Sequence, residues 1–600
     1  MLKRTIYVSE AQANLAGKEV IVNGWVHRIR EHGEGLTFIN VRDRSGVVQV
    51  IVNDKSPSQV RQTAKGLKNE YCIGVRGIVR KRDDSLINKD MITGEVEIEA
   101  SEIEVFSTCD TLPFAISDDK TQAKEDLRLK YRYLDLRSGK MKDNLILRTR
   151  FVTAIRKHLD SKGFLEIETP TLIRSTPEGA RDFLVPSRLY EGKFYSLPQS
   201  PQLYKQLLMV SGLDRYYQVA RCYRDEDARG DRQLEFTQLD LEMSFADRED
   251  VLSLMEGLFK DVFKEVVNYD LPDKFVRIPY ADAMNSYGCD KPDLRFDCRI
   301  SDFSEELKAS SFEKAKAVVC NGGFAKAIRL PLLDKSKPYS RKQLEEYLEE
   351  AKIYKNKTGF FLKAEKEGNG LALSGSAAKF FDAGQQAAII SKFALEEGDA
   401  LLVVADEKWK AACAQAGSMR SRMGAQLGLT QGKGFAFCWI VDFPLFSYNE
   451  ELGHWEAEHH MFSRPKKEHM EYLDTDPGKV LGDLYDLVLN GYEVASGSVR
   501  INEIELQEKI FEICNYSKER AQKAFGFLLE AFRYGAPPHA GIAPGIDRMC
   551  MIIQNETSIK EVIAFPKNTF AVSPMDESPS EVSEEQLREL HLIIDAKERK

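Results

Sequence analysis

The chain has 600 residues, of which 43% are hydrophobic and 30% charged, and its net charge is -9. This length exceeds what one hydrophobic core usually holds, so several domains are expected, and the acidic balance argues against a protein that coats nucleic acid. No run of about eighteen uncharged apolar residues occurs and the amino terminus has no apolar signal region, so the sequence predicts a cytoplasmic protein with no membrane partner. The ten cysteines form no CxxC pair, which favours reduced thiols over a zinc site.

Residues 1–110 have the pattern of a small barrel. Short β-type runs fill the chain from Glu19 to about Val105, with one helical connection near 59–68, as in a closed OB-fold. Residues 1–90 hold sixteen Lys or Arg against ten Asp or Glu, a local positive excess that suits a polyanion. Such barrels bind single-stranded nucleic acid through aromatic rings and cations. The candidates for these contacts, each of which alone also fits an ordinary strand position, are Arg30, Phe38, Gln49 and Arg82.

A hinge at residues 111–145 leads into a first catalytic segment, residues 146–290. A helix is predicted from Met141 to Lys162, and Gly163 ends it before a short strand and Pro170. Further on, Gln202 and Lys205 lie three residues apart and hence on one helical face. An amide beside a cation suits a small ligand with a carboxylate, whereas Lys205 alone also fits a solvated surface helix.

The stretch from Arg221 to Phe245 predicts two antiparallel strands joined by a long charged loop. Arg224 and Glu226 would share one face of a strand and present a cation and a carboxylate to one ligand. A guanidinium can hold a phosphate or carboxylate through two hydrogen bonds, and a carboxylate can accept hydrogen bonds from an amine. A solvated, charge-rich hairpin is the alternative.

Residues 291–430 have a different character, with Lys-rich and Glu-rich helical stretches and no evident catalytic cluster, and are expected to form an inserted domain. Their glycine-rich end, 428–434, lacks the spacing of a phosphate-binding loop. A second catalytic segment at 431–565 begins with a β-type run over 435–451, and residues 566–600 are expected to form a carboxy-terminal extension.

The second catalytic segment carries three groups of polar candidates. His459 and His460 are adjacent, a pair that is usually structural or exposed. Asp486 and Glu493 are seven residues apart, which is compatible with carboxylates converging on a hard cation. Arg548 begins an apolar helical run after a glycine-rich turn, where it can meet a terminal phosphate.

Three stretches, in this order, resemble motifs 1, 2 and 3 of the class II aminoacyl-tRNA synthetases: GFLEIETPTL, the YRDED run and GIDR. Together with QSPQLYKQLL and the barrel, they make nearly the whole chain resemble the bacterial aspartyl-tRNA synthetase family. The resemblance implies a multidomain α+β fold with an N-terminal OB-fold β-barrel, an antiparallel-sheet catalytic domain and an inserted α+β domain. It also implies a homodimer with Pro170 at the interface.

The resemblance further implies that L-aspartate is activated by ATP with Mg²⁺ and passed to tRNA(Asp). Its implied catalytic residues are Arg224, Glu226 and Arg548. Its implied aspartate-binding residues are Glu178, Ser200, Gln202, Lys205, Asp240, His459 and Arg500. Its implied ATP-binding residues are Arg224, Asp225, Glu226, Gln233, Phe236, Glu493, Gly545, Ile546, Asp547 and Arg548. Its implied Mg²⁺ ligands are Asp486 and Glu493, and its implied anticodon-binding residues are Arg30, Phe38, Gln49 and Arg82.

Two cations, Lys205 and Arg500, would favour aspartate over asparagine because a neutral amide would leave both unpaired. This argues against an amide substrate and hence against a relative that charges asparagine, and a ligase of free amino acids is the other alternative among the enzymes. An inactive tRNA-binding paralogue is disfavoured because Arg224, Glu493 and Arg548 are all present. The family more often has Pro at the position of Met461 and glycines at 495 and 496, so loop stiffness is expected to differ there.

The barrel carries a further hypothesis about tRNA choice. A histidine in the first barrel loop is associated with relatives that also charge tRNA(Asn), and this chain has His32 in the sequence REHGEG. Strict relatives tend to have Lys at the nearby position of Ser85. These two residues favour charging of tRNA(Asn) as well as tRNA(Asp), and a strictly tRNA(Asp)-specific enzyme is the alternative.

Overall fold

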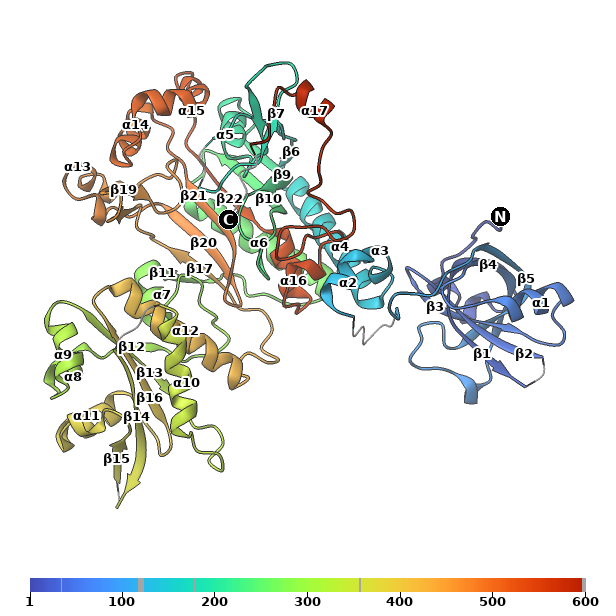
Figure 1. The fold of residues 1–600 in the computed structure, drawn as a ribbon, viewed down its shortest axis with the longest axis horizontal. Helices are drawn as coiled ribbons and strands as arrows, with labels where there is room; N and C mark the ends of the chain where they lie inside the picture. The colour runs from blue at the N-terminus through green and yellow to red at the C-terminus, as the bar shows by residue number, and fades with distance from the viewer. Residues whose placement is uncertain (34, 117–122, 177–178, 355–357, 369, 596–600) are drawn as a thin grey trace. The chain divides into compact units, whose positions relative to one another are not determined.

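The computed structural model of the protein describes residues 1–33, 35–116, 123–176, 179–354, 358–368 and 370–595 (Figure 1). The chain divides into two compact units, Met1–Asp143 and Asn144–Lys600. Within these described ranges every helix is too short or too polar to cross a membrane.

The first unit contains a closed five-stranded barrel, as the alternating pattern predicts. In hydrogen-bonded order its strands are β1 (Glu19–His32), β2 (Leu36–Asp43), β3 (Gly46–Val52), β5 (Val96–Ser107) and β4 (Cys72–Lys81). Inward valines and isoleucines of all five strands form one core, and α1 (Ser58–Gly66) packs on it through Val60 and Ala64. Strands β3 and β5 are parallel, so the chain needs a long crossover between them, which holds α1 and β4.

Short helices follow the barrel in the predicted hinge: α2 (Glu125–Lys130) and α3 (Arg132–Asp135) precede α4 (Gly139–Ser161). Within this unit, Glu70 accepts hydrogen bonds from Arg42 at 2.8 Å and from Arg137 at 3.2 Å. The Arg137 guanidinium also lies 5.0 Å from the ring of Trp25. The hinge is therefore held on the barrel by a buried carboxylate and an aromatic face.

The second unit is built on an eight-stranded sheet. In spatial order its strands are β11 (Val276–Pro279), β17 (Phe437–Val441), β20 (Leu484–Leu489), β21 (Tyr492–Val499), β22 (His539–Pro544), β10 (Glu235–Ser244), β9 (Arg215–Tyr223) and β6 (Leu165–Glu166). The central strands are antiparallel, as expected, and only the two edge strands pair in parallel.

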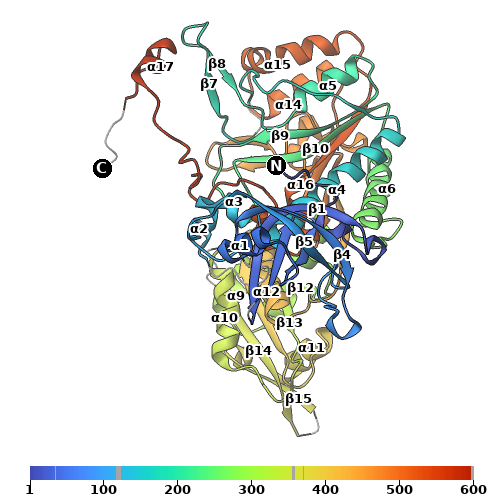
Figure 2. The same cartoon turned by 90° about the vertical axis from the view of Figure 1, so that its right-hand side faces the viewer.

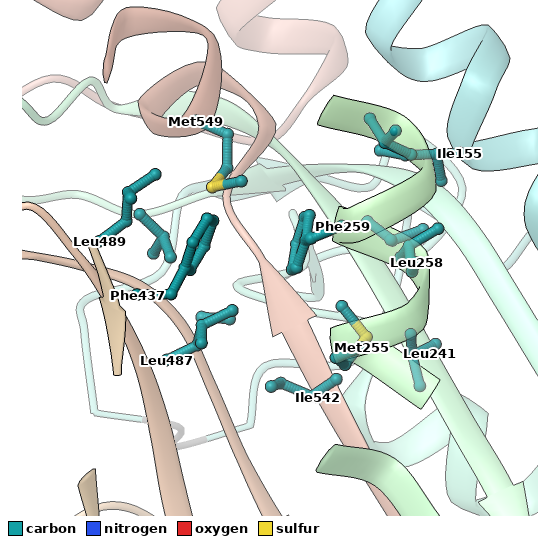
Figure 3. Packing of buried hydrophobic residues seen from close by; sticks show 14 of the residues in the cluster. Ile155, Leu241, Met255, Leu258, Phe259, Phe437, Leu487, Leu489, Ile542 and Met549 are labelled. Atoms are coloured by element: carbon teal, nitrogen blue, oxygen red, sulfur yellow. The ribbon is translucent and has the colours of Figure 1, made fainter. Parts of the chain in front are cut away.

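One face of this sheet packs against α4, α6 (Arg248–Val267) and α16 (Ile546–Ile553), and Figure 3 shows Phe259 of α6 among strand residues such as Phe437 and Ile542. The alternation along β10 explains how the sheet is two-faced. Its odd-numbered residues, Leu239, Leu241 and Met243, belong to this core. Its even-numbered residues must therefore point to the opposite face, and from Gln238 onward they are polar, whereas Phe236 is aromatic.

The predicted inserted domain has its own sheet and two cores (Figure 2). The strands, in spatial order, are β12 (Ile300–Asp302), β13 (Phe324–Leu330), β16 (Ala400–Asp406), β14 (Thr358–Glu367) and β15 (Gly370–Ser374). One core contains α8 (Ser304–Ala309), α9 (Glu313–Cys320) and α11 (Ala383–Lys392), and the other contains α10 (Arg341–Lys352) and α12 (Trp409–Gln426). Because β16 is covered on both sides, its run ALLVVA is continuously apolar.

Shorter elements from several parts of the chain complete this unit. These are α5 (Gln202–Val210), α7 (Tyr280–Tyr287), α13 (Tyr472–Thr475), α14 (Ile504–Ile513), α15 (Lys518–Phe532), the hairpin of β7 (Leu184–Pro186) and β8 (Phe194–Ser196), and the hairpin of β18 (Phe446–Asn449) and β19 (His454–Ala457). In the carboxy-terminal extension the chain forms α17 (Glu584–Glu589).

Gly497 in β21 gives a test of this packing. A Cβ at Gly497 would lie 2.5 Å from Tyr485 Cε2 and 2.9 Å from Ile542 Cβ, so Gly497→Ala is expected to destabilise the protein by about 1–3 kcal/mol. Gly257→Ala in α6 is the control, since a Cβ there meets nothing within 4 Å, and it should stabilise by roughly 0.4–1 kcal/mol. Urea denaturation of both variants measures the difference, and equal stability of the two would contradict the packing described.

Candidate active site

A cavity of about 880 Å³ lies on the polar face of the eight-stranded sheet. Its walls come from β10, β21, α5, the segment from His454 to Phe462 and the start of α16. These elements are far apart in sequence, so the cavity exists only when the whole sheet has formed.

Four buried charged side chains form a cluster at the floor of this cavity: Lys205, Asp240 and Arg500 line it, and Glu242 pairs with both cations. Lys205 of α5 donates to Asp240 Oδ1 at 2.7 Å and lies 3.2 Å from Glu242 Oε2. Arg500, next to the end of β21, donates through Nε to Glu242 Oε1 at 2.9 Å and through Nη2 to Glu242 Oε2 at 3.2 Å. All four are at most 2% exposed. Lys205 and Arg500 are therefore paired with protein carboxylates, and the two cations and two carboxylates balance one another.

Histidine and serine side chains complete the hydrogen bonding of Arg500. Its Nη1 contacts His460 Nε2 at 2.8 Å and donates to Ser498 Oγ at 2.7 Å. A guanidinium can only donate, so His460 Nε2 accepts from Arg500, while Nδ1 lies 3.3 Å from Phe462 N and 3.4 Å from Ser463 Oγ. Burial and the neighbouring Arg500 cation hold the pKa of His460 well below its usual value. A neutral His460 therefore fixes the direction of the guanidinium.

The two floor carboxylates differ in their environments. Burial raises the pKa of Asp240 despite the neighbouring Lys205 ammonium, and Asp240 Oδ2 has no hydrogen-bond partner among the described residues. Burial also acts on Glu242, but the Arg500 and Lys205 cations outweigh it and lower the pKa of that carboxyl. Glu242 therefore acts as the fixed anion of the floor, whereas Asp240 keeps an oxygen for a donor in the cavity.

A β-bulge in β21 decides which residues face the cavity. Leu487 pairs with Ala495 and Val488 pairs with Glu493, so Val494 has no partner of its own in this ladder. Val494 and Ala495 both belong to the core on the far face. The extra residue brings Glu493 onto the same face as Asp486, Ser496 and Arg500. In a regular strand over the same residues, without the bulge, Glu493 would point into the apolar core.

The motif 2 residues Arg224 and Glu226 line the cavity from the loop after β9. Their expected position within a strand is wrong, because β9 ends at Tyr223. The Arg224 guanidinium lies 5.0 Å from the centroid of Phe236, and Arg232 donates to Glu226 at 3.2 Å. Because the loop is held by these contacts, the cation and the carboxylate still reach the same cavity.

Arg548, at the start of α16, also lines the cavity and is held by backbone and side-chain oxygens. It donates to Glu493 O and, at 3.2 Å, to Asp231 Oδ2. Its Nε is buried and has no hydrogen-bond partner among the described residues. Besides Arg224 and the four-charge floor, the cavity thus has a further cation at the start of α16.

The remaining predicted residues lie in different surroundings. Further lining residues of the cavity are Ser200, Gln202, Gln233, His459 and Gly545. Asp225 does not line the cavity but forms an ion pair with Arg181, whose Nε lies 3.5 Å from Asp225 Oδ2. Ile546 lies in the hydrophobic core. Asp547 touches the cavity, but its carboxylate accepts from Thr237 N at 2.7 Å and binds Arg148. Glu178 lies outside the described residues.

Sequence reasoning missed Glu242 and gave His460 no contact. The signal for Glu242 was available, because it follows Asp240 by two residues in the alternating run LDLEM and must share its face. Its partner Arg500 is 258 residues away and could only be identified from the strand order.

In the barrel, the four predicted nucleic-acid contacts form one group. Arg30 donates to Gln49 Oε1 at 3.2 Å, Gln49 donates to Glu97 at 3.0 Å, and Arg82 lies 4.0 Å from the same Glu97. Phe38 pairs with Arg30 across β1 and β2. His32 lies at the end of β1 with its ring 6.2 Å from that of Phe38, whereas Ser85 is exposed in a 3₁₀ turn.

Comparisons with known proteins agree with this architecture. The family described as tRNA synthetases class II (D, K and N) matches residues 124–569, and the OB-fold nucleic acid binding domain matches residues 20–106. A solved asparaginyl-tRNA synthetase from Pyrococcus horikoshii superposes with a TM-score of 0.58 at 18% identity, covering 94% of this chain and 98% of its own, which shows the shared fold. The fold and the cavity are those of a class II aminoacyl-tRNA synthetase.

Close relatives narrow this class. The chain is 57% identical over 99% of both chains to the Aspartate--tRNA(Asp/Asn) ligase of Treponema denticola. It is 45% identical, again over 99% of both chains, to the Aspartate--tRNA ligase of Macrococcus caseolyticus. The chain belongs to the aspartate–tRNA ligase family.

The buried histidines predict how stability depends on pH. Burial lowers the pKa values of His459, His460 and His539 below the value of 6.5 that an exposed histidine has. In the folded state each therefore takes up its proton at a lower pH than in the unfolded state, so this contribution to stability is complete above about pH 6.5 and is lost as the pH falls below it. His460→Gln, which keeps an acceptor for Arg500, should make the fall in Tm between about pH 7.5 and 5.5 shallower. His591→Gln in the exposed tail is the control, and an equal slope in both variants would contradict the assignment.

Proposed function

We propose that this chain joins L-aspartate to tRNA(Asp), and also to tRNA(Asn), through an aspartyl-adenylate made from ATP. The observation that carries the proposal is the buried floor of Lys205, Asp240, Glu242 and Arg500 in a cavity that also contains Arg224 and Arg548. Relatives of 45–57% identity are named as aspartate–tRNA ligases, which supports the same substrate.

The floor is suited to a ligand with both a carboxylate and an ammonium group. A carboxylate would take the remaining hydrogens of Lys205 Nζ and Arg500 Nη2. The other Nζ hydrogens point to Asp240 and Glu242, the other Nη2 hydrogen points to Glu242, and the Nη1 hydrogens point to Ser498 and His460. The ammonium group would donate to Asp240 Oδ2. Selection of aspartate over asparagine then rests on these two fixed donors, because an amide NH₂ would place its own hydrogens against them.

Adenylate formation brings two anions together, so fixed cations and orientation supply most of the catalysis. Arg224 would hold the aspartate carboxylate and the α-phosphate, and Arg548 the γ-phosphate. Phe236 would stack on the adenine, with Glu226 accepting a hydrogen bond from its amino group. The adenylate carboxyl is then attacked by a terminal ribose hydroxyl of tRNA, and AMP leaves with the bonding electron pair.

Mg²⁺ fits the residues of this site. Asp486 Oδ1 is buried without a hydrogen-bond partner among the described residues, and burial together with Glu493 raises the pKa of Asp486 well above its usual value. No group of three or more metal-ligating side chains occurs in the described parts of the chain, which suits Mg²⁺, because it is usually held by one or two carboxylates and substrate phosphates. When bound by Asp486 and Glu493, Mg²⁺ would neutralise phosphate charge.

Charging of tRNA(Asn) is inferred from the barrel. His32 packs edge-on against Phe38, the ring proposed to stack on an anticodon base. The loop therefore presents an imidazole beside the base-binding surface, where a residue decides how strictly one anticodon is preferred.

A homodimer is also inferred. Edge strand β6 exposes Leu165, and Leu172, Leu184 and Leu189 nearby in the chain are each about half exposed or more. An open strand edge with exposed apolar side chains is a surface on which a second copy can pack.

Lys205→Met tests the amino-acid site. Breaking a buried pair costs about 3–5 kcal/mol, so aspartate-dependent pyrophosphate exchange should fall by roughly 10²- to 10³-fold or more, while ATP binding remains measurable by calorimetry. Lys157→Met, at an exposed ion pair on α4, is the control and should leave exchange unchanged. Exchange retained in Lys205→Met would refute the assigned role.

Aspartylation of two transcripts that differ only in the Asp or Asn anticodon tests the tRNA choice. Comparable charging of both is the expected result, and His32→Ala should reduce charging of the Asn transcript more than that of the Asp transcript. Charging of the Asp transcript alone would show a strict enzyme, and charging of neither, without pyrophosphate exchange, would refute the proposed function.

A further inference from the structure

The histidine segment of the active site, here residues 458–460, contacts the inserted domain. Glu458 directly precedes the pair His459–His460, and its Oε1 is 2.8 Å from Nζ of Lys410 in the first turn of α12. The Glu458 side chain is only 22% exposed, so this ion pair is partly shielded from water. Helix α12 otherwise packs on the inserted sheet and on α10.

A chain of aromatic rings gives a second connection, to which Lys410 also contributes, since its Nζ lies 5.9 Å from the ring centroid of Tyr280. Trp409, beside Lys410, lies 6.4 Å from Tyr280 of α7. Tyr280 lies 5.0 Å from Phe443, which meets His459 edge-on at 4.8 Å. Trp409 also donates to Asn285 of α7 at 3.0 Å, which fixes its ring.

The crossing of α7 and α12 leaves no room for adjustment. Gly288 ends α7 in the left-handed region, with φ of 74°, and Gly417 lies in the middle of α12. A Cβ at Gly417 would stand 2.6 Å from Gly288 O. Only glycine permits this distance, so the helix that carries Lys410 and Trp409 has a fixed position.

We propose that α12 of the inserted domain is a positioning element of the aspartate site, in which Lys410 and Trp409 hold the histidine segment so that His460 stays on Arg500. This inference rests on the proposed aspartate-binding role of Arg500. Lys410 and Trp409 touch no reacting group, and they act through Glu458, His459 and His460.

A matched pair of variants tests the ion pair. Lys410→Met removes the contact to Glu458, whereas Lys408→Met removes an ion pair of similar length, 2.7 Å, from the same helix end to Glu450 at the tip of the β18–β19 hairpin. In aspartate-dependent pyrophosphate exchange, Lys410→Met should raise the KM for aspartate by about three- to tenfold with the KM for ATP unchanged, since a partly buried ion pair contributes on the order of 1 kcal/mol. Lys410→Arg should restore the KM, and Lys408→Met should change neither constant.

The two routes can be separated by a double variant. Lys410→Met combined with Glu458→Gln should raise the KM for aspartate no more than Lys410→Met alone, because the contact that Glu458→Gln removes is already lost. Trp409→Leu should add to the effect of Lys410→Met. An unchanged KM for aspartate in Lys410→Met, or an equal effect in Lys408→Met, would overturn the proposal.

Hydrogen exchange provides a readout that does not depend on activity. Lys410→Met should speed exchange in the peptide covering residues 457–463, whereas Lys408→Met should leave it unchanged. If hydrogen exchange is faster in Lys410→Met but the wild-type protein shows no aspartate-dependent activity, the proposed function is refuted, while the contact between Lys410 and the histidine segment is supported. Equal exchange in both variants would refute the positioning role itself.

Discussion

The structure of the active site depends on the balance of four charges buried together. Isolated ions cannot be taken out of water without a large loss of free energy, and even a buried pair is weak evidence for stability. Lys205, Asp240, Glu242 and Arg500 come from α5, β10 and the end of β21, so the cluster forms only after those elements are aligned. Removing any member leaves an uncompensated charge. The sheet is therefore specified by its polar face as well as by its apolar one.

This balance also changes how the site is understood to select its ligand. A cluster with two excess cations would attract any small anion. The observed cluster is neutral overall, so an incoming carboxylate must find particular hydrogens on Lys205 and Arg500 that the protein carboxylates have not taken. Geometry then contributes more to the discrimination than net charge does.

The amino-acid sequence predicts much of this architecture because many of its signals are local. Alternation gave the barrel strands, and the order of three short motifs gave the catalytic sheet and the residues that line its cavity. What the sequence could not provide were partners chosen by the fold. Glu242 was overlooked because its role in the site comes from its pairing with Arg500, which is distant in the sequence. Arg224 was predicted to lie within a strand, but β9 ends one residue earlier, at Tyr223. The contact between Lys410 and Glu458 depends on helices from an inserted domain, whose position no local pattern reveals.

The bulge at Val494 has a consequence for how β21 responds to the loss of a residue. Before the bulge the residues that face the cavity have odd numbers, as Glu493 does, and after it they have even numbers, as Ser496 and Arg500 do, so the two sides differ in parity. Loss of Val494 would make the two parities agree, so Glu493, Ser496 and Arg500 would still share one face of a regular strand. The deletion would remove the local bend and added twist that a bulge gives to a strand, so Val494 determines the course of the backbone more than the assignment of side chains to the two faces.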